Sequence, residues 1–175
     1  MKKILVIVAH PNLAMSHVNK AWIKQLQRYP EITIHHLYEE YPYRPINVYQ
    51  EQQLLLQHDR IVFQFPLFWY SSPALLKQWQ DEVLSFIWSK NEGDQLKGKE
   101  LLLAISIGDP KHVFQAKGFT IEEIMRPMEL MAISNQMTFL PIFAFYNTNS
   151  AGEEEIADSA KAYIEHIFQS GLTDT

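Results

Sequence analysis

Three short stretches of the chain carry the residues whose types and spacing could do chemistry. Residues 10–19 hold hydroxyl, imidazole and amide side chains, residues 66–70 hold three consecutive aromatic rings, and residues 106–109 combine a hydroxyl, a glycine and a carboxylate. Such a set can grip a phosphate, cover a flat ring and bind the polar edge of that ring. The elements around the three stretches must bring them together for this chemistry to occur.

The first stretch is suited to phosphate binding. Ser16 is placed to cap a helix that runs to about Arg28, and the free backbone N–H groups at a helix N-terminus bind anions. His17 and Asn19 add an imidazole and an amide to the same turn. The stretch contains no glycine, so it is neither a Walker loop nor a GxGxxG dinucleotide fingerprint. Ordinary helix capping by Ser16 is the alternative interpretation.

The second and third stretches could enclose a flat ring. Residues 67–70 read Leu-Phe-Trp-Tyr and lie between a predicted strand and a predicted helix, where α/β proteins bind ligands. Consecutive aromatic side chains are costly to leave in water unless something flat covers them. Gly108, in the third stretch, lets the backbone approach a ring edge closely. The alternative is that the aromatic loop packs on the protein's own core or forms a dimer contact.

Five apolar runs predict the strands that position these stretches, at residues 4–9, 31–37, 61–65, 100–107 and 137–145. Helical patterns occupy residues 17–28, 48–57, 73–87, 120–132 and 153–168. In the third helix Ser72 is the expected N-cap and Pro73 the first helical residue, and Pro127 should kink or restart the fourth. Pro141 makes the fifth strand an edge candidate.

Strands that alternate with helices predict an α/β protein with a parallel sheet. We expect a flavodoxin-like three-layer sandwich whose five strands have the order 2-1-3-4-5, because this is a common order for doubly wound sheets. The loops after strands one, three and four then converge, and these are the three stretches above. Together they predict a pocket for a phosphorylated flat heterocycle, and flavin mononucleotide fits that description. We expect one domain over residues 1–170 and a short tail over 171–175.

Composition and charge exclude several other classes of protein. The 175 residues are 47% hydrophobic and 13% aromatic, as in a folded domain with a real core. The net charge of −5, with no basic run, does not favour nucleic-acid binding. The chain has no cysteine, which excludes disulfides, thiolate catalysis and zinc–sulfur sites. His35 and His36 are adjacent in a strand and point to opposite faces, so we expect no metal site. The apolar run at residues 4–9 is too short for a signal peptide or a membrane span, so we expect a cytoplasmic protein.

At these same residues the chain resembles the flavodoxin-like NAD(P)H:quinone oxidoreductases related to DT-diaphorase. The matching segments are residues 4–19 (a strand, His-Pro, then Ser-His-x-Asn-Lys), 65–79 (with Pro-x-x-Trp-Tyr-Ser-x-Pro-x-Leu-Leu-Lys-x-Trp) and 126–141. The similarity covers nearly the whole chain. It is closest to the short bacterial branch, which includes general-stress oxidoreductases and the ancillary subunits of glutathione-gated potassium-efflux antiporters.

The resemblance implies a flavin held noncovalently at a homodimer interface. We prefer FMN to FAD because the sequence offers one helix N-terminus for one phosphate and no second phosphate grip. The implied cofactor contacts are His10, Ser16, His17, Val18 and Asn19 around the phosphate and ribityl chain, Pro66, Leu67, Phe68, Trp69 and Tyr70 along the isoalloxazine, and Ser106, Ile107, Gly108 and Asp109 at its polar edge.

The sequence departs from the family at two places. The loop after the fourth strand is usually Thr-Thr-Gly-Gly in the family, and here it is Ser-Ile-Gly-Asp. The tyrosine and histidine that assist hydride transfer in the mammalian enzyme would fall near Phe114 and Thr120. Phe114 has no hydroxyl and cannot give that assistance, so no catalytic side chain is assigned; the flavin itself carries the chemistry.

The leading hypothesis is a flavin-dependent NAD(P)H:quinone oxidoreductase. NAD(P)H would give a hydride to the flavin and leave, and a quinone or another small aromatic acceptor would take its place, in a ping-pong mechanism. One alternative is a regulatory ancillary subunit that docks on a membrane transporter, through residues 38–49, at the inner face of the cell membrane. Another is a one-electron flavodoxin carrier, although such carriers are usually strongly acidic.

Overall fold

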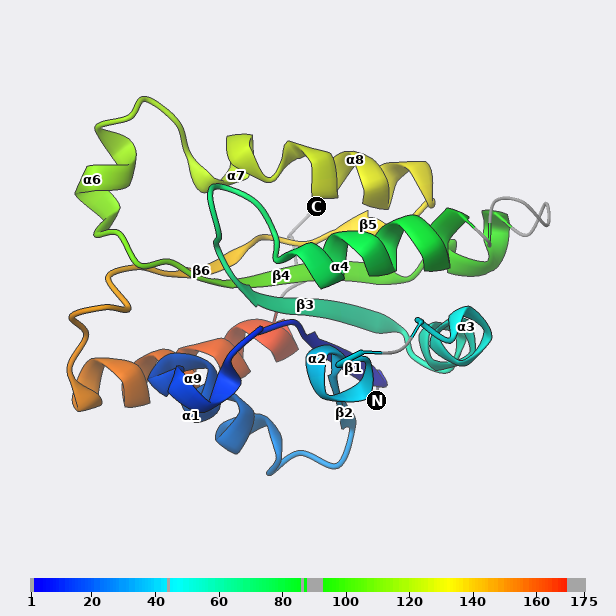
Figure 1. Ribbon diagram of the computed structural model, residues 1–175, viewed down its shortest axis with the longest axis horizontal. Coiled ribbons are helices and arrows are strands. Elements are labelled where there is room, and N and C mark those ends of the chain that lie inside the picture. The colour runs from blue at the N-terminus through cyan, green and yellow to red at the C-terminus, as the bar shows by residue number, and fades with distance from the viewer. Residues whose placement is uncertain (1, 44, 86, 88–92, 170–175) are drawn as a thin grey trace.

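A parallel sheet lies between two layers of helices in the computed structural model, which describes residues 2–43, 45–85, 87 and 93–169 (Figure 1). The strand order is β2-β1-β3-β4-β5, β6 also pairs with β4, and every pairing is parallel. The strands are β1 (Ile4–Val8), β2 (Ile32–His36), β3 (Arg60–Pro66), β4 (Glu100–Ser106), β5 (Thr138–Phe139) and β6 (Phe143–Phe145). The predicted flavodoxin-like α/β sandwich is confirmed, with a sixth short strand.

The helices cover both faces of the sheet. In Figure 1, α1 and α9 lie together below β3, α4 crosses β4, and α7 and α8 lie at the top of the view. The helices are α1 (His17–Leu26), α2 (Leu37–Glu40), α3 (Val48–Leu56), α4 (Ala74–Trp79), α6 (Lys111–Gln115), α7 (Ile121–Ile124), α8 (Arg126–Ser134) and α9 (Glu153–Gln169). A π-helical turn, Gln80–Leu84, continues α4, and short 3-10 turns span Leu13–Met15 and Gly93–Leu96.

Alternate side chains of the strands pack into two separate hydrophobic cores, one on each face of the sheet. In β1, Ile4, Val6 and Val8 pack with apolar residues of α1 and α9, whereas Leu5 and Ile7 pack with residues of α3, α4 and α8. This follows from the two-residue period of a strand, which sends alternate side chains to opposite faces. Because both faces are covered, most residues of the central strands are apolar, as their sequence predicted, and the polar exceptions Arg60, Gln64, Glu100 and Ser106 have hydrogen-bond partners.

The predicted fifth strand is divided in two. β5 and β6 both pair with β4, and residues 140–142 between them lie outside the ladder. Pro141 has no N–H to donate, so the ladder breaks beside it. Pro127 acts as the predicted restart: α7 ends at Ile124, and α8 begins at Arg126 with the proline in its first turn.

The predicted start of the helix after β3 was wrong by one residue. Pro73 is the N-cap and the helix begins at Ala74, because Pro73 has an extended backbone (ψ 150°). Ser72 is not the N-cap, and its buried Oγ has no hydrogen-bond partner among the described residues. The hydroxyl of Tyr38, in the unpredicted helix α2, instead accepts a hydrogen bond from the backbone N–H of Leu75 at 3.3 Å. A contact remote in sequence has replaced the local cap.

Two further sequence predictions concern a C-terminal tail and membrane-spanning segments. The predicted tail at residues 171–175 lies outside the described residues. Within the described part of the chain, no helix is both long and apolar enough to cross a membrane.

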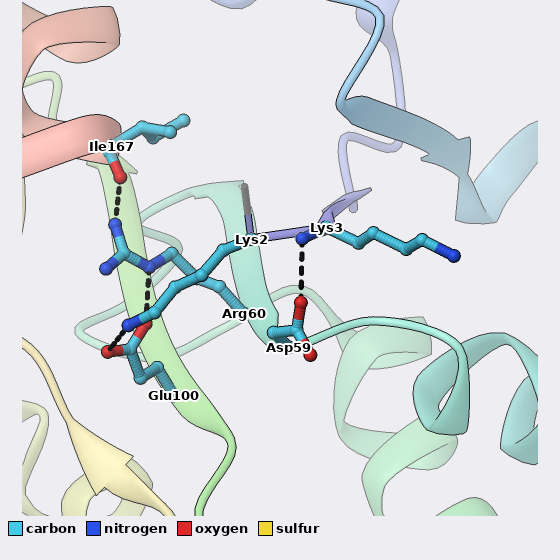
Figure 2. Close-up of polar contacts among 6 residues, drawn as sticks. All are labelled: Lys2, Lys3, Asp59, Arg60, Glu100 and Ile167. Atoms are coloured by element: carbon cyan, nitrogen blue, oxygen red, sulfur yellow. Dashed lines mark hydrogen bonds and ion pairs between the residues drawn. The ribbon is translucent and has the colours of Figure 1, made fainter.

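A buried ion-pair network fastens the amino ends of the central strands to α9 (Figure 2). Arg60 at the start of β3 is 3% exposed, and its Nε donates to Glu100 Oε2 at 2.7 Å. Its Nη1 donates to the carbonyl oxygen of Ile167, in the last turn of α9, and Lys2 Nζ donates to the other oxygen of Glu100. The carboxylate of Glu100 therefore compensates a guanidinium that would be costly to bury unpaired.

Acid should weaken this network in a way that depends on Glu100. Burial by itself raises the pKa of this carboxyl, but hydrogen bonds from Arg60 and Lys2 outweigh it and hold the pKa below its usual range. The stabilisation is therefore present above the unfolded-state pKa of about 4.3 and is lost as the pH falls through the lower folded-state pKa. Glu100→Gln should lower the free energy of unfolding at pH 7 by about 1–3 kcal/mol, and the difference from wild type should shrink in acid.

Urea denaturation at a series of pH values measures this effect. Asp158→Asn is the matched control, because Asp158 forms a solvent-exposed pair with Lys161 at 2.9 Å and should change the stability by less than about 0.5 kcal/mol. Equal losses for Glu100→Gln at pH 7 and at pH 3 would contradict the assignment.

Candidate functional site

A cavity of about 540 Å³ opens at the carboxyl ends of β1, β3 and β4. The predicted residues that line it are His10, Ser16, His17, Val18, Pro66, Leu67, Phe68, Ser106 and Gly108. Four further lining residues, Asn12, Met15, Thr148 and Asn149, were not predicted. The parallel order brings together the three loops that the sequence singled out, because the carboxyl ends of parallel strands share one edge.

One end of the cavity is the N-terminus of α1. Ser16 is its N-cap, as predicted, and accepts a hydrogen bond from the backbone N–H of Asn19 at 3.2 Å. The N–H groups of His17 and Val18, in the first turn of this ten-residue helix, have no intrahelical acceptor. Free N–H groups and the helix dipole favour an anion here.

His10 adds a hydrogen-bond donor at the same end. Burial lowers the pKa of its imidazole and so favours the neutral ring. Its Nδ1 accepts a hydrogen bond from the backbone N–H of Asn12 at 3.1 Å, which places the ring proton on Nε2. The ring also packs edge-on against Phe68, with 6.4 Å between centroids, so it links the polar and the apolar parts of the cavity.

The aromatic loop is a tight two-residue hairpin. Phe68 and Ser71 exchange two backbone hydrogen bonds of 3.0 Å, and both residues between them have positive φ, 48° for Trp69 and 63° for Tyr70. Positive φ at both central residues is the geometry of type I′ turns, which favour Asn-Gly. A left-handed backbone costs a residue with a side chain roughly 1–2 kcal/mol. Strain of this kind is found at ligand sites, where the surrounding structure over-determines the backbone.

A second, apolar pocket of about 390 Å³ lies beside the hairpin. Phe68 lines the first cavity, and Tyr70 lines the second with Phe114, Lys117, Phe119 and Ile124. Tyr70 lies 6.3 Å from Phe114 between ring centroids, and the ammonium of Lys117 lies 5.1 Å from the centre of the Tyr70 ring. Two neighbouring hollows, each with an aromatic wall, therefore flank one turn.

Five predicted site residues do not line the first cavity. The Trp69 side chain is 92% exposed, and Tyr70 faces the second pocket. Ile107 is buried beside the end of β6, where its N–H donates to Phe145 at 2.9 Å. Asp109 forms an ion pair with Lys117 at 2.7 Å, and Asn19, 1% exposed, bonds to the Ser16 and Ser106 hydroxyls.

Gly108 allows a close approach of Asn149 to the cavity wall. A Cβ atom at position 108 would lie 2.8 Å from Asn149 Nδ2, which is too close for a real contact. The group that approaches Gly108 here is a side chain of this protein, and the approach of its backbone to a ring edge stays a prediction. Asn149 could have been found by the rule that located the other loops, because it follows β6, the last strand beside β4.

The chain belongs to the flavodoxin-like fold family, whose model matches residues 2–167. YdeQ of Bacillus subtilis, which is named an uncharacterized NAD(P)H oxidoreductase, is 52% identical over 169 residues, which cover 94% of this chain and 86% of that protein. The ancillary protein KefG of a glutathione-regulated potassium-efflux system, from Cronobacter sakazakii, is 38% identical over 92% of this chain and 90% of its own length.

Solved structures agree with this assignment. General stress protein 14 of Treponema denticola, in complex with FMN, superposes with a TM-score of 0.89 at 38% identity, over 95% of this chain and 98% of that one. An NADPH-quinone reductase from P. pentosaceus gives a TM-score of 0.84 at 40% identity, over 94% and 96% of the two chains. The resemblance found from the sequence is therefore confirmed.

Replacing Trp69 by a residue suited to a left-handed backbone should stabilise the protein. Trp69→Asn removes an exposed side chain at φ 48°, so the turn should gain roughly 1 kcal/mol of stability, measured by urea denaturation. Tyr43→Asn is the control, because Tyr43 is fully exposed and its φ is not positive; it should leave the stability unchanged. A lower stability for Trp69→Asn would contradict the strain at this residue.

Proposed function

We propose that this protein is an NAD(P)H-dependent oxidoreductase that works through a noncovalently bound FMN. The observation that carries the proposal is the cavity at the sheet edge, which joins an anion-binding helix N-terminus to an aromatic wall. A phosphate and a flat ring system on one ligand match these two ends. The relative solved with FMN, which shares 38% of its sequence with this chain, supports the choice of ligand.

The residues present fit FMN. Ser16, with the N–H groups of His17 and Val18, would hold the phosphate, and Phe68 would lie along the ring system. Ser106 and the unpredicted Asn149 would meet polar atoms of the ligand. One helix N-terminus lines the cavity and accommodates one phosphate, which favours FMN over FAD. When bound, FMN supplies reversible two-electron chemistry with hydride donors and acceptors.

The second pocket suits the two substrates in turn. Its aromatic lining would receive the nicotinamide and then a quinone or a similar small aromatic acceptor, which gives ping-pong kinetics. Phe114 in this pocket has no hydroxyl, and Thr120, whose hydroxyl caps α7 by accepting from Glu123 N–H at 3.2 Å, has no imidazole to take the place of a histidine. Neither residue replaces a proton-donating tyrosine–histidine pair, so the chain's role is to bind and orient the ligands.

A homodimer would complete the site. Trp69 stands almost wholly exposed beside the cavity, and an exposed indole next to a ligand site favours cover by a partner. We propose that a second copy of the chain supplies that cover and that the protein acts in the cytoplasm.

A regulatory role on a transporter is the second candidate. The similarity to KefG favours it, and it would place the protein at the inner face of the membrane. Within the predicted docking segment at residues 38–49, Tyr41 is buried and donates to Glu51 at 2.6 Å. Tyr43 and Tyr49 are the exposed aromatic residues described in this segment, and we propose that they contact the partner. Recovery of a potassium-efflux antiporter from membranes by the wild type, but not by a Tyr43→Ala/Tyr49→Ala variant, would support this role.

The visible spectrum tests the leading proposal. The purified protein, with FMN added if needed, should be yellow, should bleach with NADPH and should recover its colour when a quinone is added. Initial rates at several quinone concentrations should give parallel double-reciprocal lines. Protein that stays colourless with FMN would refute the proposal, and a stable blue semiquinone during reductive titration would favour a one-electron carrier.

Gly108→Ala tests the geometry of the cavity wall. The added methyl group displaces the Asn149 amide, so the affinity for FMN should fall roughly 3–10-fold, the value of about one hydrogen bond. Gly152→Ala is the control, because its Cβ would meet only Glu155 Oε2 at an ordinary 3.8 Å. Fluorescence titration of FMN measures both affinities, and equal affinities for the two variants would contradict the role of Asn149.

A further inference from the structure

A chain of buried polar side chains runs from α9 to the wall of the cavity. The Tyr163 hydroxyl donates to Gln64 Oε1 at 3.3 Å, and Gln64 Nε2 donates to Asn19 Oδ1 at 3.1 Å. Asn19 Nδ2 then donates to Ser16 Oγ and to Ser106 Oγ, each at 3.0 Å. Tyr163 and Gln64 are 0% exposed and Asn19 is 1% exposed, so the chain is shielded from water.

A backbone carbonyl group fixes the donor-to-acceptor direction of this series of hydrogen bonds. Gln64 Nε2 also lies 3.5 Å from the backbone carbonyl oxygen of Asn19, which can only accept a hydrogen bond. If the Gln64 amide were inverted, its oxygen would face two acceptors of Asn19, the side-chain and the backbone oxygen. Gln64 must therefore present its N–H groups to α1, and the Asn19 amide must present its own N–H groups to the two serines.

This direction decides what the two serines offer to a ligand. Ser16 Oγ accepts from Asn19 Nδ2 and from the Asn19 backbone N–H, which fills both of its acceptor positions. Its O–H is left to donate to the cavity. Ser106 Oγ accepts from the same amide and likewise keeps its O–H as a donor. In the opposite direction both hydroxyls would donate inward to Asn19 and would turn lone pairs toward the ligand.

We propose that Gln64 and Tyr163, which lie outside the cavity lining, are positioning residues that make the Ser16 and Ser106 hydroxyls donors toward an anionic, oxygen-rich ligand. The inference rests on the proposed FMN function and extends it to two residues that do not touch the ligand. It also gives Asn19 the role of a relay rather than a direct contact. This role explains why a glutamine stands among the apolar residues of β3: its amide N–H groups orient Asn19, which in turn orients the two serine hydroxyls.

Gln64→Glu is the sharpest test because it changes the hydrogen-bonding character with almost no change of shape. Burial favours the protonated carboxyl at this position, so the affinity is compared at pH 6 and pH 9. The ionised carboxylate repels both oxygens of Asn19, so the Asn19 amide inverts, both serines turn their lone pairs outward, and the loss of affinity grows with pH. The affinity for FMN should fall roughly 10–100-fold, as expected for the loss of one or two hydrogen bonds to a charged or polar ligand. Tyr163→Phe, which only frees Gln64 Oε1, should weaken binding roughly 2–5-fold and should fold even if the first variant does not.

A double-mutant cycle separates positioning from general destabilisation. In a Ser16→Ala/Ser106→Ala background, the Gln64 and Tyr163 substitutions should change FMN affinity by less than about twofold, because the groups through which they act are gone. Ser159→Ala is the matched control: it removes a buried hydrogen bond between α1 and α9, donated by Trp22 Nε1 at 3.0 Å, and should leave FMN affinity unchanged. Dissociation constants come from fluorescence titration with FMN, and thermal unfolding reports folding separately.

The outcomes distinguish this inference from the proposed function. A wild-type protein that binds no FMN refutes the function and the inference together. A wild-type protein that binds FMN, with Gln64→Glu and Tyr163→Phe equally tight, overturns the positioning role alone. Equal losses in the serine-containing and serine-free backgrounds also overturn it, because a merely structural residue would give that result.

Discussion

The parallel pairing of β1, β3 and β4 is the constraint on which the rest of the structure depends. Their register aligns the strand ends, so the loops after them open at one edge of the sheet. Helices cover both faces of the sheet, so most strand side chains are apolar, and the carboxyl edge is the place where the polar loops meet. The cavity is therefore a consequence of the topology, and its chemistry comes from the loops that the topology brings together.

The two ends of the sheet have different tasks. At the amino ends, Arg60 and Glu100 form a buried pair that joins β3 and β4 to the last turn of α9. At the carboxyl ends, free N–H groups, a strained turn and two pockets lie close together. Compensated charges stabilise the first end, while groups without protein partners characterise the second. These groups contribute little to the stability of the folded protein, and they are available to bind a ligand.

The buried amides of Asn19 and Gln64 connect the core of the protein to the ligand-binding edge of the sheet. Polar groups in an apolar core are costly unless each is hydrogen-bonded, and together they use the two serines, a tyrosine and a backbone carbonyl as partners. Because each donor must meet an acceptor, all the hydrogen bonds of this network run in one direction, from Tyr163 toward the two serines. A core polar network can thus define the hydrogen-bonding character of a surface site.

The sequence by itself predicted the first four strands, the longer helices, the sheet order and the three loops that meet at the cavity, but it missed the short helices α2 and α6 and the break in the fifth strand. It also determined the Ser16 cap, because a cap joins residues three positions apart and its signal is local. Only the tertiary structure decided that Tyr38 replaces Ser72 as the cap partner of α4, that Trp69 and Tyr70 turn away from the first cavity, and that Asn19 points inward. These outcomes depend on partners remote in sequence and on backbone angles that no local pattern specifies, so they appear only when the whole chain is packed.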